Sequence, residues 1–221
     1  MSSARPARRA GFTLVEVLVA MVIMAIMSLI AWQGVDGIVR ARDSNQERLE
    51  QTLRLETVIA QWEQDLASLQ ETTAVPALTC DGQSVRLTRR AEGGMQVVAW
   101  SLRPDNTNSM WQRWAGPPVT TTTALQEMWF RTQQFQGGEP GQLKALTGLD
   151  QWQVYFFQGN AWANCQSTGN VAGTASAPGV GSPMAPGGIR QALPSGVRLV
   201  LAFAPGSGLN GSLVRDTLLA P

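Results

Sequence analysis

The spacing of apolar residues changes along this chain and divides it into distinct parts. The stretch from Phe12 to Trp32 is almost continuously apolar, and the nineteen residues Val17–Val35 that follow Glu16 carry no charge. A helix over 12–32 would be about 32 Å long at about 1.5 Å per residue, enough to span the hydrocarbon core of a membrane. We therefore expect a transmembrane helix over 12–35.

A second pattern begins near Gly37. From there to Gln70 apolar residues recur at spacings of three to five, and charged residues, including Asp65, lie between them. A single apolar stripe at this spacing predicts an amphipathic helix. We expect one helix from about Phe12 to about Gln70, with a soft point at Gly34 and Gly37, and we expect its charged residues to form a solvated face. The stripe consists of Leu49, Leu53, Val58, Ile59, Trp62, Leu66 and Leu69.

Alternating apolar and polar residues appear after Pro76 and indicate β-strands. Glu92-Gly93-Gly94 between the first two strands predicts a hairpin turn, and 125–135 fits either a strand or a short helix. Residues 167–196 are rich in Gly, Pro and Ser and predict a long surface loop. A long helix before an antiparallel sheet gives an α+β fold. The predicted strands are 84–89, 95–102, 110–114, 151–157, 197–203 and 213–219.

The tryptophans and cysteines add two details to the predicted fold. Eight tryptophans are present, and we expect those of the soluble half to pack in the core. Cys80 and Cys165 can form one disulfide in an oxidising compartment or can remain free, and the sequence leaves both alternatives open.

Catalytic chemistry is poorly supported by the composition. The sequence has no histidine, the commonest general base and metal ligand. Acids such as Asp81, Glu139 and Asp150 are scattered, so a membrane-tethered enzyme is a weak alternative and no cofactor is expected. The turn Asp105-Asn106-Thr107-Asn108 has the ligand types that calcium prefers, but it lacks the spacing of a known calcium loop, so a solvated turn is the better interpretation.

The most specific motif lies where the apolar helix begins. Three arginines, Arg5, Arg8 and Arg9, precede the run Gly11-Phe12-Thr13-Leu14-Val15-Glu16. A carboxylate inside a membrane helix is costly and requires a reason. Here the sequence resembles the type IV pilin superfamily. An ordinary signal anchor with a chance glutamate is an alternative, and a secretory signal peptide fits less well because its apolar region is only about 7–15 residues long.

The resemblance implies specific processing of the N-terminus. A prepilin peptidase would cleave between Gly11 and Phe12 on the cytoplasmic side and methylate the new N-terminus at Phe12. The carboxylate of Glu16 would then pair with the terminal amine of a neighbouring subunit during assembly. The positive flank predicts a cytoplasmic leader, with the remainder in the periplasm of a Gram-negative bacterium.

Later features are similar to the J-type minor pseudopilins of type II secretion systems. They include Gln61-Trp62-Glu63-Gln64-Asp65-Leu66, the segment 146–157 and the segment 193–201. This resemblance implies four segments: a leader at 1–11, a filament-core helix at 12–35, an amphipathic half of the stem at 36–72, and a periplasmic β-rich domain at 73–221.

The resemblance also implies a role and partners. J-type subunits join I-type and K-type minor pseudopilins in a tip complex that primes pseudopilus assembly, with the H-type subunit and the major pseudopilin as further candidate partners. Such a subunit is not an enzyme and does not bind nucleic acid. The alternative is a minor pilin of a type IV pilus, which would serve adhesion, motility or DNA uptake.

Overall fold

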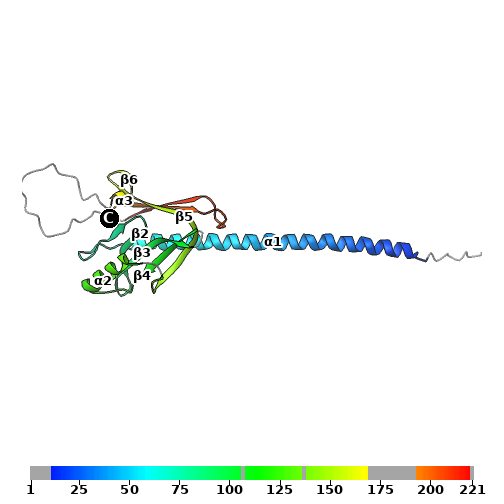
Figure 1. Cartoon of the computed structure of the whole chain (residues 1–221), viewed down its shortest axis with the longest axis horizontal. Helices are drawn as coiled ribbons and strands as arrows, with labels where there is room; N and C mark the ends of the chain where they lie inside the picture. Colours follow the sequence, from blue (N-terminus) through cyan, green and yellow to red (C-terminus); the bar gives the residue numbers. More distant parts are fainter. Residues whose placement is uncertain (1–10, 106–107, 136–137, 169–192, 220–221) are drawn as a thin grey trace, which may run out of the picture. The chain divides into compact units, whose positions relative to one another are not determined.

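The computed structural model describes residues 11–105, 108–135, 138–168 and 193–219. The order of elements is one long helix, a set of antiparallel strands interrupted by two short helices, and two final strands. The chain divides into two compact units, one that ends at Glu50 and one that begins at Gln51. The predicted α+β fold is therefore confirmed: a long apolar N-terminal helix precedes an antiparallel sheet domain (Figure 1).

The first helix, α1 (Leu14–Ala67), is 54 residues long and passes without interruption through Gly34 and Gly37, and the soft point expected there stays a prediction. It also ends three residues before the predicted Gln70. The backbone of 68–70 instead bonds to strand β2, because Gln70 N–H donates to the carbonyl of Thr88 at 2.9 Å and Arg90 N–H donates to the carbonyl of Ser68 at 2.9 Å.

The sheet contains eight strands, and every pairing is antiparallel. Its order is β1-β2-β3-β4-β5-β7-β8, with β6 paired to β5 outside this path. The strands are β1 (Leu78–Cys80), β2 (Ser84–Ala91), β3 (Gly94–Asp105), β4 (Asn108–Ala115), β5 (Gln142–Gln158), β6 (Ala161–Asn164), β7 (Gly196–Phe203) and β8 (Ser212–Leu218), and the other helices are α2 (Thr122–Gln133) and α3 (Cys165–Thr168).

All six predicted strands are present, together with the turn at Glu92 and Gly93. The ambiguous segment 125–135 proves largely helical, because α2 covers it as far as Gln133. Two strands were missed, since β1 and β6 have only three and four residues. The predicted loop at 167–196 falls mostly on 169–192, and Asn106 and Thr107 of the proposed turn also lie outside the described residues.

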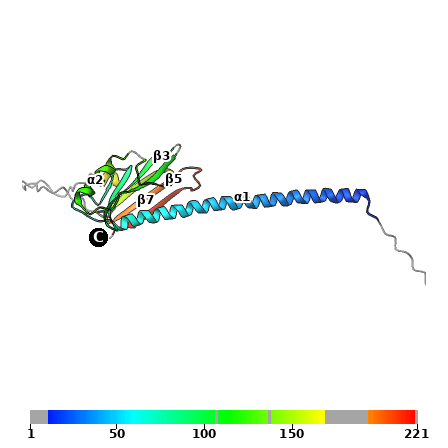
Figure 2. The same ribbon diagram turned by 90° about the horizontal axis from the view of Figure 1, so that it is seen from below.

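Alternating residues of the strands supply two separate cores. Val98 and Trp100 of β3 face the C-terminal part of α1, where Trp62 and Leu66 are fully buried. Val97 and Ala99 of the same strand face the other way, into a cluster with Leu125 and Trp129 of α2. Figure 2 shows α2 and the C-terminal end of α1 on opposite sides of the strands. The period of two therefore places a helix on each face of the sheet.

Tryptophans dominate the core on the α1 side. The rings of Trp62 and Trp100 are 5.6 Å apart, Trp100 and Trp111 are 4.4 Å apart, and Trp152 lies 5.8 Å from Trp111. Each of these four side chains is at most 6% exposed. Core packing by tryptophan is confirmed for these residues, and Trp114 and Trp129 are buried on the α2 side.

Candidate assembly site

Thr13 and Glu16 form a reciprocal cap at the start of α1. The backbone N–H and the hydroxyl of Thr13 both donate to Oε2 of Glu16 at 2.9 Å, and the N–H of Glu16 donates to the Thr13 hydroxyl at 3.3 Å. This arrangement is a capping box, in which two otherwise unpaired helix N–H groups find acceptors. Sequence reasoning assigned Glu16 a role but missed Thr13, although the spacing Thr-x-x-Glu is a known signal for this cap.

The cap leaves part of the Glu16 carboxylate free for a second interaction. Both hydrogen bonds use Oε2, and Oε1 accepts none from the part of the chain that the structure describes. A carboxylate has lone pairs for about four hydrogen bonds. Glu16 can thus cap the start of the helix and still accept a hydrogen bond from a cationic group of another chain.

Gly11 is not required by the fold. A Cβ built on Gly11 would meet no described atom within 4 Å, and Gly11 is not among the residues with positive φ. Glycine is normally needed where φ is positive or where another group approaches closely. The structure offers neither reason, so a requirement for glycine here would have to come from another protein that binds this segment.

The apolar surface of the first unit is uncovered. Every described residue from Gly11 to Glu50 is exposed, including Phe12 at 89% and Leu14 at 76%. Soluble proteins rarely expose continuous apolar surface of this extent unless it binds a membrane or another protein. This part of α1 is also long and apolar enough to cross a membrane. Its apolar residues therefore form a surface that lipid or other chains can cover.

The same exposure holds for the apolar residues that lie further along the first unit. Val35, Ile38, Val39 and Leu49 are 48% to 71% exposed. These positions are free for contacts with other chains or with lipid.

Asp65 does not belong to a solvated face, and that prediction is wrong. It is fully buried, and it accepts hydrogen bonds from Trp100 Nε1 (2.8 Å), from Arg113 Nε and Nη2 (2.8 and 2.9 Å) and from Gln61 Nε2 (3.1 Å). Arg89 Nη1 lies 3.0 Å from the same carboxylate. A buried charge is tolerated only when it is paired and hydrogen-bonded, and here both conditions are met.

The helical period contained a signal for this burial. Asp65 follows Trp62 by three positions and precedes Leu69 by four, so it lies on the buried stripe. Its partners, on β2, β3 and β4, could not be identified from spacing alone, because strand pairing brings them together. Asp65 therefore ties the end of α1 to the sheet.

The other acidic candidates remain dispersed. Asp81 pairs with Arg86 at 2.6 Å, Asp105 ends β3, Glu139 precedes β5 and Asp150 lies within β5. Within the described ranges no three His, Cys, Asp or Glu residues gather as a metal site would require. The structure does not bring these acids together into one site.

Cys80 and Cys165 are joined by a disulfide, with their Cα atoms 5.7 Å apart. Cys80 ends the edge strand β1, and Cys165 begins the short helix α3. The bond links parts of the second unit that are 85 residues apart in sequence. It therefore fixes α3 to the edge of the sheet.

Comparison with known proteins places the N-terminal motif in a known class. Residues 6–32 match the family model described as the prokaryotic N-terminal methylation motif. The match includes Gly11, Phe12 and Thr13, which directly precede α1, and Glu16 in its first turn. The chain therefore carries the N-terminal motif of type IV prepilin-like proteins.

Similarity to one curated protein indicates which type of prepilin-like protein this chain resembles. The chain is 24% identical over 173 residues to the type II secretion system protein J of Vibrio cholerae, and the match covers 70% of this chain and 73% of the relative. The chain thus resembles the J-type minor pseudopilins, and the two similarities together support a pseudopilin. With its apolar N-terminal helix, the chain fits a single-pass inner-membrane protein.

Proposed function

We propose that this chain is a J-type minor pseudopilin of a type II secretion system. In this role it joins the tip complex that primes a pseudopilus for the export of folded proteins across the outer membrane. The observation that carries the proposal is the extent of the similarity to protein J, because 70% coverage reaches far beyond the shared methylation motif at 6–32.

The proposal includes an orientation and a processing step. The leader faces the cytoplasm and the sheet domain faces the periplasm, as the leader arginines favour. Prepilin peptidase cleaves between Gly11 and Phe12 and methylates Phe12. The lack of any structural need for glycine at Gly11 supports recognition of this residue by an enzyme. The chain itself acts through assembly and catalyses no reaction, which the absence of histidine supports.

The processing step can be tested by intact-mass measurement after co-expression with a prepilin peptidase. The expected product begins with N-methylated Phe12. The variant Gly11→Val should remain at full length because the added side chain crowds the protease at the scissile bond, whereas Gly34→Val should be cleaved normally. A mature N-terminus at any other residue would contradict the assignment to this class.

The partner choice can be tested by co-purification from the membranes of the native host. The tagged chain should recover the I-type and K-type minor pseudopilins, with smaller amounts of the H-type subunit and the major pseudopilin. The second candidate, a minor pilin of a type IV pilus, rests on the shared methylation motif alone. Recovery of pilus subunits without pseudopilins, or loss of piliation without loss of secretion on deletion, would favour it.

A further inference from the structure

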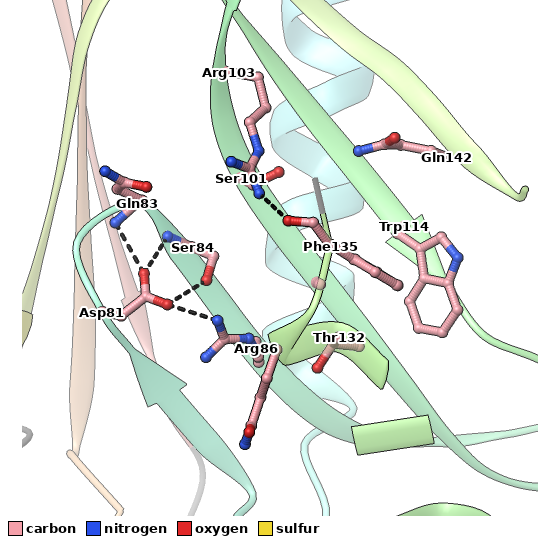
Figure 3. Close-up of a pocket in the computed structure, with 12 residues that line it drawn as sticks. Asp81, Gln83, Ser84, Arg86, Ser101, Arg103, Trp114, Thr132, Phe135 and Gln142 are labelled. Carbon is pink, nitrogen blue, oxygen red and sulfur yellow. Dashed lines mark hydrogen bonds and ion pairs between the residues drawn. The ribbon is translucent and has the colours of Figure 1, made fainter. Parts of the chain in front are cut away.

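A polar cavity lies on the face of the sheet that α2 covers, outside everything that the proposed function uses. Its volume is about 200 Å³, and its walls come from β2, β3, β4, the start of β5, the turn between β1 and β2, and the segment that ends α2. Figure 3 shows Arg86 on one side of the cavity, Ser101 and Arg103 on the middle strand, and Trp114 on the far side.

The two arginines in the cavity wall are only partly satisfied. Arg86 Nη2 donates to Asp81 Oδ2 at 2.6 Å, and Arg103 Nη2 donates to the carbonyl of Phe135 at 2.7 Å. The Nε atoms of both are buried, yet neither has an acceptor among the residues that the structure describes. Buried donors without acceptors are costly. A turn of either side chain toward the cavity would bring these donors to a ligand oxygen and remove this cost.

The charges of the cavity favour an anion with one negative charge. Burial raises the pKa of Asp81, but hydrogen bonds from Ser84 and the nearby charge of Arg86 outweigh that effect and hold the pKa below its usual value. Asp81 is therefore ionised at neutral pH, and it offsets one of the two guanidinium groups. One positive charge remains, which a single carboxylate would balance.

One wall of the cavity is apolar. The rings of Trp114 and Phe135 meet edge to face with centroids 4.8 Å apart, and Ala99 lies beside them in the lining. A ligand that fits this site would therefore place an oxygen-bearing end near the arginines and an aliphatic portion against the rings.

We infer that this cavity binds a peptide carboxylate, either an acidic side chain or a chain end, presented by a partner protein. Arg86 and Arg103 bind the oxygens through their guanidinium groups, and Trp114 with Phe135 packs against the carbon atoms of the ligand. The inference does not depend on the proposed secretion role, since it rests only on the cavity and its arginines.

The test uses the full-length chain in detergent micelles with ¹⁵N-labelled tryptophan. The indole N–H of Trp114 donates to the carbonyl of Pro140 at 2.9 Å, so its NMR signal reports on the cavity wall. The first probe is acetyl-Gly-Glu-Gly-amide, and acetyl-Gly-Gln-Gly-amide is its uncharged match. Acetyl-Gly-Ala with a free carboxylate distinguishes a chain end from a side chain, and sodium phosphate tests a simple anion.

We expect a saturable shift of the Trp114 signal with one or both carboxylate peptides and none with the glutamine peptide. Arg86→Gln and Arg103→Gln should each weaken binding at least tenfold, whereas Arg198→Gln, which removes an arginine paired with Asp216 on other strands, should leave it unchanged. Ser101→Val fills the cavity without a change of charge and should also weaken binding, which covers the case in which an arginine variant does not fold.

Four results would overturn the inference. The first is equal binding of the glutamic acid and glutamine peptides, and the second is unchanged affinity in Ser101→Val and in the folded arginine variants. The third is a shift with phosphate but not with the carboxylate peptides, and the fourth is the absence of a saturable shift with any of these probes.

Discussion

The two ends of α1 use apolar residues in opposite ways. Between Gly11 and Glu50 every described side chain is exposed, although this part holds the most apolar sequence of the protein. Near the other end, Val58, Ile59, Trp62 and Leu66 are buried at 9% exposure or less against the sheet. One helix thus carries a surface that packs within its own fold and a longer surface that no described residue covers.

This difference in exposure separates the residues of α1 that stabilise the fold from those that are available for contacts with other chains. The buried end includes a charged residue, Asp65, whose four partners lie in the same unit. The exposed end includes a charged residue, Glu16, whose only described partner is its neighbour Thr13. Substitutions at the buried end should therefore change stability, and substitutions at the exposed end should change association.

The largest effect on stability is expected for Asp65→Ala. It leaves Arg89 and Arg113 close together in a buried region without their shared carboxylate. Breaking a buried pair in this way costs about 3–5 kcal/mol of unfolding free energy. Urea unfolding of the full chain in micelles, followed by tryptophan fluorescence, measures it. The control Glu63→Gln breaks an exposed pair with Arg215 and should change stability by less than about 0.5 kcal/mol. Equal effects of the two variants would contradict the role of Asp65.

A somewhat smaller loss is expected when the disulfide is removed. Cys80→Ser together with Cys165→Ser should lower the free energy of unfolding by about 2–4 kcal/mol, because the bond closes a loop of 85 residues and restricts the unfolded chain. Reduction of the wild-type chain should give the same loss, whereas the double variant should not respond to reductant. Unchanged stability in both experiments would show that the bond contributes nothing to the second unit.

A contrast between local and long-range interactions also explains which elements could be predicted from the sequence. The apolar run and the amphipathic stripe predict α1 because both are local patterns, and alternation predicts the long strands. The short strands β1 and β6 carry too few residues for a pattern, and the first half of β5 is disturbed by two register shifts against β4 and by Gly148 at φ +76°. The network around Asp65 depends on residues 24 to 48 positions away, which only strand pairing brings together.

For the candidate site, the motif from Gly11 to Glu16 was visible because its residues are consecutive. The hydrogen bonds of Thr13 to Glu16 are also local and follow from their spacing. The cavity at Arg86 and Arg103 had no sequence signal, because its residues come from separate strands and the end of α2. Interactions between residues that are close in sequence could therefore be predicted, and interactions that strand pairing brings together could not.

At the exposed end, Leu49→Asp is expected to leave stability unchanged, because Leu49 is 58% exposed. Burial of one leucine at an interface stabilises it by about 1.5–3 kcal/mol, so the variant should weaken binding to I-type and K-type partners about tenfold or more. Asn45→Asp adds the same charge one helical turn earlier and is the matched control. A large fall in the melting temperature of Leu49→Asp would place Leu49 in the core of the subunit.

The most direct test of the division between folding and assembly is Glu16→Ala. Measured together on protein from the native host, leader cleavage and the unfolding midpoint of the sheet domain should match the wild type, and recovery of the chain with the proposed pseudopilin partners should fall at least tenfold. Glu50→Ala, in the same unit but away from the N-terminal motif, is the control and should retain assembly. Wild-type assembly and secretion by Glu16→Ala would contradict the account.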